Sequence, residues 1–235
     1  MYMNSSAKFI LKLLSILLIL GLVIFLIQVG RYYFQIKTGA ISIQEGGSFS
    51  AIKSNATEQK YNAREIIDMD APAFGADLPE LTIIEFASFS CPFSKDVSSI
   101  AREMMLQYQD KINFIYREFP IDELYPESSA LALIGKCANE QSAFWQLHDK
   151  LYQSDIDPQK AIKQIAIDEN KFWSCVSEKR YLKSIEADLS AGLNNNVRGT
   201  PTFFFIKKGY EDKPIRVEGA IPKETFKQLI DKLLE

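Results

Sequence analysis

The chain is poor in the residues that most often bind metals or catalyse reactions. It has three cysteines and one histidine in 235 residues, and their spacing is not that of a structural zinc site, so we expect no metal. We expect the single histidine, His148, to be structural, because it lies beside Asp149 on an amphipathic stretch. The cysteines are therefore the residues to examine first.

Basic charge is scarce outside the N-terminus. Of the 27 basic residues, four fall in residues 1–40, which hold no acidic residue, and this leaves 23 basic against 30 acidic residues in the remainder. A mildly acidic body does not favour nucleic acid as a partner.

The N-terminal apolar run lacks the small-residue site at which a signal peptide is usually cleaved. Residues 13–27 (LLSILLILGLVIFLI) are uncharged, and the apolar segment from Phe9 to Gly30 approaches the roughly 20 residues of a spanning helix. We predict that residues 1–37 form a signal-anchor; a long, cleaved signal peptide is the alternative. Both place residues 40–235 outside the cytoplasm. An uncleaved anchor would hold them at the cytoplasmic membrane, whereas cleavage would release them to the periplasm.

The next segment lacks any sustained hydrophobic period. Residues 38–64 are rich in glycine, serine and polar residues, so we predict a flexible linker there and a folded domain over 65–235. Residues 81–88 (LTIIEFAS) and 112–119 (INFIYREF) are typical of buried strands. Between them, apolar residues recur every three or four positions from Pro92, which predicts a helix and a βαβ unit with parallel strands.

The C-terminal half divides into a helical block and a terminal ββα segment. Residues 128–192 contain hardly any strand-like run, whereas 202–208 and 214–219 are typical of a hairpin and a final helix begins near Pro222. A single α/β domain with a helical insertion over about 128–192 explains this order.

Cys91 lies between the first strand and the helix that begins at Pro92. Unpaired backbone N–H groups and the macrodipole at a helix N-terminus favour a thiolate, which is the nucleophilic form of cysteine. Ser94 is placed to donate its hydroxyl to that thiolate. The alternative is a buried structural cysteine. Farther along, Thr200-Pro201 precedes a predicted strand, where a cis or an ordinary trans peptide bond would fit equally well.

These segments together resemble a known family. TIIEFASFSCPFSK, REFP (117–120), CANEQSAFWQLHDKLYQ and VRGTPTFFF stand in the order seen in bacterial DsbA-like thiol:disulfide interchange proteins. The resemblance implies a thioredoxin-like fold with an inserted all-helical subdomain, Cys91 as a surface nucleophile and Pro201 as a cis-proline beside it. It also implies that Glu85 is a buried carboxylate near the site, whereas the sequence alone allows a solvated strand-end carboxylate. Candidate substrate-binding residues are Pro92, Phe93 and Thr200.

The chain lacks the family's second active-site cysteine, because Ser94 stands in its place. A dithiol oxidase is therefore in doubt, and monothiol exchange through a mixed disulfide, as in an isomerase or reductase, is favoured. Release then needs an external thiol, either glutathione as co-substrate or a redox partner, and the substrates are extracytoplasmic cysteine-containing proteins. A redox-inactive client-binding module or holdase and a glutathione-linked transferase or reductase are the alternatives.

Cys137 and Cys175 both fall in the helical block. Two such cysteines commonly pair in an oxidising compartment, so we predict a structural disulfide between them. Two separate buried thiols are the alternative.

Overall fold

The computed structural model describes residues 22–23, 61–153 and 157–235. The chain divides into two units, residues 1–48 and 49–235, and the fold below is that of the second unit. No helix among the described residues is long and apolar enough to cross a membrane. The predicted signal-anchor over 1–37 lies, except for Leu22 and Val23, outside the described residues.

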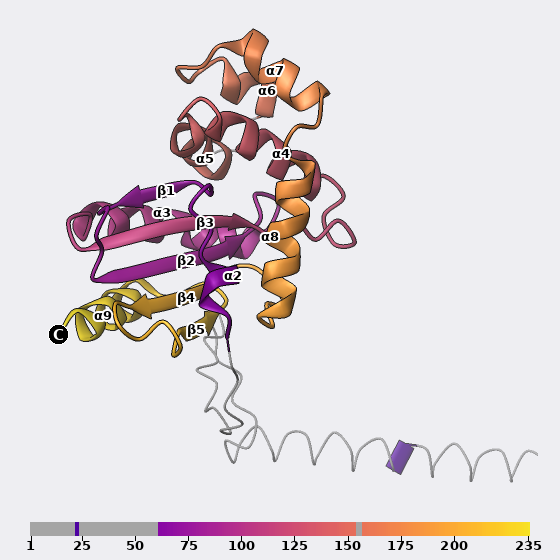
Figure 1. Cartoon of the computed structure of the whole chain (residues 1–235). Helices are drawn as coiled ribbons and strands as arrows, with labels where there is room; N and C mark the ends of the chain where they lie inside the picture. Colours follow the sequence, from indigo (N-terminus) through magenta and orange to yellow (C-terminus); the bar gives the residue numbers. More distant parts are fainter. Residues whose placement is uncertain (1–21, 24–60, 154–156) are drawn as a thin grey trace, which may run out of the picture. The chain divides into compact units, whose positions relative to one another are not determined.

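A mixed sheet of five strands forms the centre of this unit, in the order β1-β3-β2-β4-β5 (Figure 1). The two central strands, β2 (Leu81–Ala87) and β3 (Ile112–Glu118), are parallel and joined by α3 (Pro92–Gln107). β4 (Thr202–Lys207) pairs antiparallel with β2, and β5 (Ile215–Glu218) pairs antiparallel with β4. The βαβ unit and the hairpin predicted from the sequence are therefore both present.

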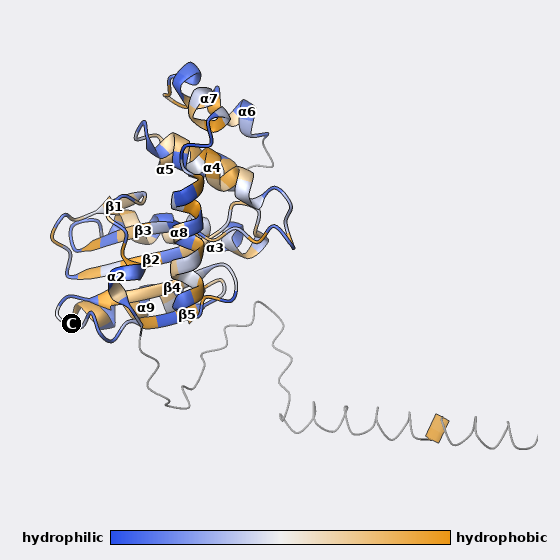
Figure 2. Ribbon diagram, turned by 45° about the vertical axis from the view of Figure 1, so that its right-hand side comes forward, coloured by the Kyte–Doolittle hydropathy of each residue, from blue (hydrophilic) through white to orange (hydrophobic). Residues whose placement is uncertain are grey.

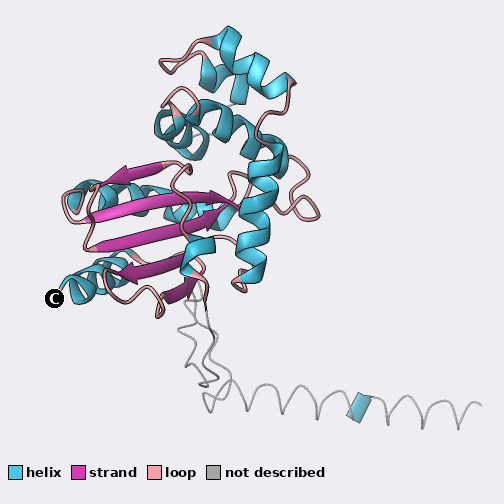
Figure 3. Ribbon diagram, viewed as in Figure 1, coloured by secondary structure: helices cyan, strands magenta, loops and turns pink. Residues whose placement is uncertain are grey.

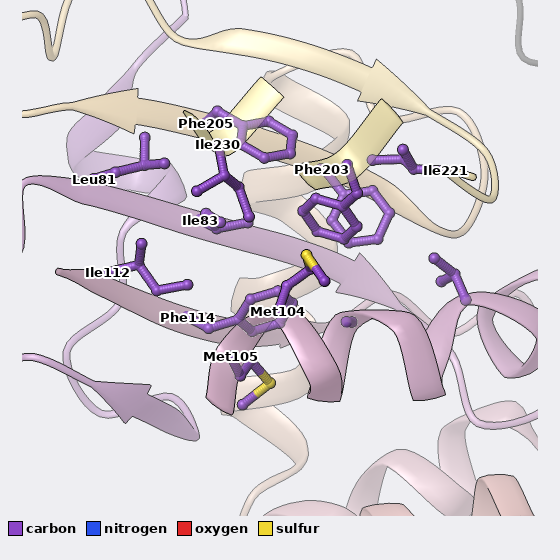
Figure 4. Close-up of a cluster of buried hydrophobic side chains, with 13 residues drawn as sticks. Leu81, Ile83, Met104, Met105, Ile112, Phe114, Phe203, Phe205, Ile221 and Ile230 are labelled. Atoms are coloured by element: carbon purple, nitrogen blue, oxygen red, sulfur yellow. The ribbon is translucent and has the colours of Figure 1, made fainter. Parts of the chain in front are cut away.

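Helices cover both faces of the sheet (Figure 3). α3 and α9 (Lys223–Leu234) pack on one face, where Met104 and Phe226 join Ile83, Phe114 and Phe203 of the strands in one buried cluster (Figure 4). α8 (Leu182–Asn194) lies on the other face, where Gly192 allows close approach. A Cβ atom at Gly192 would lie 2.7 Å from Phe119.

The described residues between 128 and 194 are mainly helical, as expected. It comprises α4 (Ser128–Asn139), α5 (Phe144–Gln153), α6 (Pro158–Ile162), α7 (Glu169–Ser177) and α8. α4 to α7 stack beyond the β1 edge of the sheet in Figure 1, and orange, hydrophobic stretches mark α4 and the strands in Figure 2. The insertion has its own buried cluster, which includes Leu147, Ile162 and Phe172.

A buried ion network joins the insertion to the sheet. The Arg117 Nε atom of β3 lies 2.6 Å from Oδ1 of Asp188 in α8, and Nζ of Lys136 in α4 lies 2.7 Å from Oδ2 of the same carboxylate. All three side chains are nearly inaccessible to solvent. Removal of one partner from such a network is strongly destabilising, because a charge is then left buried without its counter-charge.

Two short elements were missed by the sequence analysis. α2 (Ala63–Ile66) buries Ile66, and Tyr61 before it packs edge-on against Phe204 at 5.5 Å between ring centroids. The predicted linker boundary at residue 64 is therefore wrong at its C-terminal end, since the folded unit already includes Tyr61. β1 (Ala73–Gly75) is an edge strand, antiparallel to β3.

Candidate active site

Cys91 is the N-cap residue of α3. Its backbone is extended (φ −83°, ψ 121°), and Pro92 follows as the first helical residue, where its lack of an N–H costs nothing. The Cys91 side chain makes no capping hydrogen bond to the helix. The thiol is therefore at a helix N-terminus, as predicted, and the first-turn N–H groups donate no hydrogen bond to its sulfur.

The Thr200-Pro201 loop lies against the thiol. The Thr200-Pro201 peptide bond is cis, and the Cys91 Sγ–H donates to the Thr200 carbonyl oxygen at 3.2 Å. The register of the sheet explains the contact, because Phe86 of β2 lies opposite Thr202 of β4. Cys91 follows Phe86 by five residues and Thr200 precedes Thr202 by two, so in antiparallel strands both lie beyond the same end of the β2–β4 pair.

The thiol is not on the surface. Cys91 is only 3% exposed, so the expectation of a surface nucleophile is wrong for this state of the molecule. The neighbouring Phe93 is 56% exposed and Pro92 is also exposed. The cis-proline loop covers the sulfur, and no sequence signal near Cys91 reveals this cover, because Thr200 is 109 positions away.

Ser94 holds the active-site loop together. It is fully buried, and the Ser88 backbone N–H donates to its Oγ at 3.5 Å. The Ser88 hydroxyl in turn lies 2.6 Å from the Ser128 hydroxyl at the start of α4. The hydroxyl at position 94 therefore links the loop before Cys91 to α3, a role the sequence analysis did not foresee.

Glu85 is a buried carboxyl of the central strand. It is 2% exposed, so the alternative of a solvated strand-end carboxylate is wrong. Burial raises its pKa to about 8, because the charged form loses its hydration. The carboxyl therefore keeps its proton at neutral pH.

A tyrosine pair lies beside Glu85 and was missed by the sequence analysis. Tyr116 is opposite Glu85 in the sheet, and its hydroxyl lies 2.9 Å from that of Tyr152 on α5. Burial raises the pKa of both tyrosines well above the ordinary value. His148 packs on Tyr152 with 4.8 Å between ring centroids and is buried, as expected for a structural residue; burial lowers its pKa.

Cys137 and Cys175 are joined in a disulfide between α4 and α7, with an S–S distance of 2.02 Å. Both residues are fully buried. The chain has three cysteines, so Cys91 is the one that remains free. The site therefore contains a thiol with no second thiol of the same chain to resolve it.

Three buried polar atoms have no hydrogen-bond partner in the part of the chain that the structure describes: Ser90 Oγ, Thr200 Oγ1 and Glu118 Oε1. Two of the three residues flank the thiol, one in the loop before it and one in the cis-proline loop. Within the same residues, no group of three or more histidine, cysteine, aspartate or glutamate side chains could hold a metal ion.

A mixed sheet of this topology with a helical insertion, a cysteine at the N-terminus of α3 and a cis-proline loop beside it together form a thioredoxin-like fold. A family model described as thioredoxin matches residues 69–232. The chain therefore belongs to the thioredoxin family.

Solved structures give the same fold. The thiol-disulfide exchange protein alpha-DsbA2 of Wolbachia pipientis is 20% identical, with a TM-score of 0.62, over 72% of this chain and 90% of that one. A periplasmic thioredoxin-like protein of Salmonella enterica serovar Typhimurium is 22% identical, with a TM-score of 0.55, over 72% and 94%.

One relative found by sequence is a much longer protein. The Na+/H+ antiporter NhaA 3 of Salinispora tropica is 29% identical over 129 residues, which cover 53% of this chain and 20% of the antiporter. The match therefore spans only about a fifth of that relative's length.

Proposed function

We propose that this protein is a membrane-tethered, extracytoplasmic thiol-disulfide oxidoreductase of the monothiol type, an isomerase or reductase and not a dithiol oxidase. The observation that carries the proposal is the position of the free Cys91 at the N-terminus of α3 against the cis-proline loop, with a buried Ser94 where a resolving thiol would stand. The Cys91 thiolate attacks a client disulfide, one client sulfur leaves as a thiolate, and a mixed disulfide forms.

Release of the client then depends on a thiol from outside the chain. Cys137 and Cys175 are already joined, and Ser94 cannot form a disulfide. A second client thiol, glutathione or another redox protein attacks the mixed disulfide and returns Cys91 to the thiolate. In this scheme Glu85, which holds its proton at neutral pH, is the nearby buried acid that exchanges a proton as the site changes charge.

The cis-proline loop has a second part in the proposal. In the free protein the Thr200 carbonyl accepts the Cys91 Sγ–H. When Cys91 loses its proton or forms a mixed disulfide, that donor disappears, and the carbonyl becomes available to a backbone N–H of an extended client. Pro92 and Phe93, which follow the thiol in the chain and are exposed, offer apolar contact to a client.

Three observations support an extracytoplasmic, membrane-attached location. A structural disulfide persists in oxidising compartments. One structural relative is described as periplasmic. The uncharged run over 13–27 supplies the tether. N-terminal sequencing of the exported protein tests it: an intact N-terminus in the membrane fraction is expected, and a mature terminus between residues 28 and 60 would contradict it.

Reaction with a disulfide probe tests the chemistry. The full chain, with Cys91 as a free thiol and the Cys137–Cys175 disulfide intact, is incubated with oxidised glutathione, and its intact mass is measured in wild type, Cys91→Ala and the neighbouring control Ser90→Ala. Wild type and Ser90→Ala are expected to gain one glutathione that reductant removes, whereas Cys91→Ala gains none. Absence of the adduct in wild type would reject the enzyme.

One observation favours a second candidate, the redox-inactive client-binding module. Cys91 is 3% exposed, so a protein disulfide has to displace the cis-proline loop to reach it. If the module is correct, reduced clients bind wild type and Cys91→Ala equally well, and no mixed disulfide with a client protein accumulates.

A further inference from the structure

The N-terminus of α3 has no side-chain cap, and neither have those of α4, α8 and α9. In α6 and α7, the Asp157 and Asp168 side chains accept hydrogen bonds from first-turn N–H groups. α3 is 16 residues long, and the side chain of its N-cap residue, Cys91, makes no such bond. The first N–H groups of a helix have no acceptor within the helix itself, so they are available to an oxygen placed beyond Sγ.

A residue in contact with the thiol also carries a hydroxyl without a partner. Among the described residues, nothing forms a hydrogen bond with the buried Oγ1 atom of Thr200, and Thr200 as a whole is 8% exposed. This residue already contacts the thiol, since its carbonyl oxygen lies 3.2 Å from Sγ. A buried hydroxyl without a partner is unfavourable, and an oxygen atom bonded to Sγ would provide one.

We propose that Cys91 reacts with a hydroperoxide and that the first turn of α3 and the Thr200 hydroxyl stabilise the resulting sulfenic acid. The oxygen of a sulfenic acid stands one bond beyond Sγ, at the position that a carboxylate oxygen occupies in aspartate. Aspartate is among the preferred N-cap residues. Oxidised Cys91 would thus complete the cap that α3 lacks. The inference rests on the proposed function only in taking Cys91 to be a nucleophile.

The burial of the thiol favours a small oxidant. Hydrogen peroxide can reach a sulfur that is 3% exposed, whereas a folded disulfide-bonded protein cannot do so without loop movement. The Cys91 thiolate displaces hydroxide from the peroxide, forming an S–O bond and breaking the O–O bond. A small thiol such as glutathione then displaces water to form a mixed disulfide, and a second one releases Cys91 and the oxidised thiol. The net reaction consumes one peroxide and two thiols.

The Thr200 hydroxyl is tested with hydrogen peroxide as the probe. The full chain, with Cys91 as a free thiol and the Cys137–Cys175 disulfide intact, receives peroxide, the sulfenic acid is trapped with a 1,3-diketone, and the rate is read by intact mass. The rate of alkylation by iodoacetamide is measured in parallel. The ratio of the two rates is expected to fall roughly three- to tenfold in Thr200→Val, the effect of one hydrogen bond, and to be kept in Thr200→Ser. Thr82→Val, on the same sheet but away from the thiol, is the matched control.

The results that would reject the proposal differ from the one that it predicts. A ratio that is the same in Thr200→Val and wild type overturns the proposal. If Thr200→Val does not fold, the contrast is made between Cys91→Asn and Cys91→Ala, since the asparagine oxygen stands where the sulfenic oxygen would. A melting temperature for Cys91→Asn no higher than for Cys91→Ala rejects the open cap. If Cys91 exchanges disulfides but its peroxide reaction does not depend on Thr200, only this inference is rejected. If the peroxide reaction depends on Thr200 but Cys91 does not exchange disulfides, only the proposed function is rejected.

Discussion

The helical insertion differs in the state of its cysteines from the active-site corner of the sheet, which is formed by Cys91, the start of α3 and the Thr200-Pro201 loop. In the insertion, Cys137 and Cys175 are joined in a buried disulfide. At the corner, Cys91 is free and two nearby hydroxyls have no partner among the described residues. Natural proteins break local rules mainly at functional sites. The contrast therefore separates a region built for stability from one left open for reaction.

The largest effect is expected where the two regions are joined. Asp188→Asn leaves the Arg117 and Lys136 charges buried without their counter-charge, and we expect it to lower the free energy of unfolding by about 3–5 kcal/mol. Denaturant unfolding measures this loss. Asp231→Asn removes an exposed ion pair with Lys227 and serves as the control, with stability close to wild type. A stable Asp188→Asn variant would show that the network does not hold the insertion to the sheet.

Removal of the disulfide comes next. Cys137→Ala with Cys175→Ala opens a loop of 38 residues, and the chain-entropy model predicts a loss of about 3–4 kcal/mol. Glutathione adduct formation at Cys91 is expected to continue, because the disulfide acts within the insertion. A double variant that is stable but no longer reacts at Cys91 would contradict the separation of the two regions.

Glu85 makes stability depend on pH in a direction that can be checked. Its pKa is raised to about 8 in the folded protein. At a pH above the pKa of Glu85 in the unfolded chain, the folded protein therefore binds more protons than the unfolded chain, and stability falls as pH rises. Between pH 5 and 8 this group is expected to cost about 3–4 kcal/mol. Glu118 carries a raised pKa as well, so the test is the difference between wild type and Glu85→Gln. Equal pH profiles for the two would show that Glu85 is not held protonated.

Much of the fold follows from the sequence, because its main elements are long. β2 and β3 are seven-residue runs of strand-forming hydrophobic residues, α3 carries a helical period over 16 residues, and the three predicted ranges match the structure closely. α2 and β1 are four and three residues long, too short for any period, and they exist because Asn195 and β3 bind their backbones.

The chemistry of the site was only partly readable. Strand–cysteine–proline–helix placed Cys91, and the Thr-Pro step placed the loop. The burial of the thiol depends on Thr200, and the ion network joins Arg117 to Asp188 across 71 positions. Such contacts arise from tertiary packing and leave no local pattern in the sequence.

The central claim is that Cys91 attacks disulfides but has no resolving thiol, and the lifetime of its mixed disulfide tests this most directly. Wild type and Ser94→Cys are each loaded with one glutathione at Cys91, and the loss of the adduct is followed by intact mass without added thiol. Wild type is expected to keep the adduct until a thiol is added. Ser94→Cys is expected to release it rapidly, because an intramolecular thiol has a large effective concentration. An adduct that leaves wild type as fast as Ser94→Cys, or that never forms in either protein, would contradict the account.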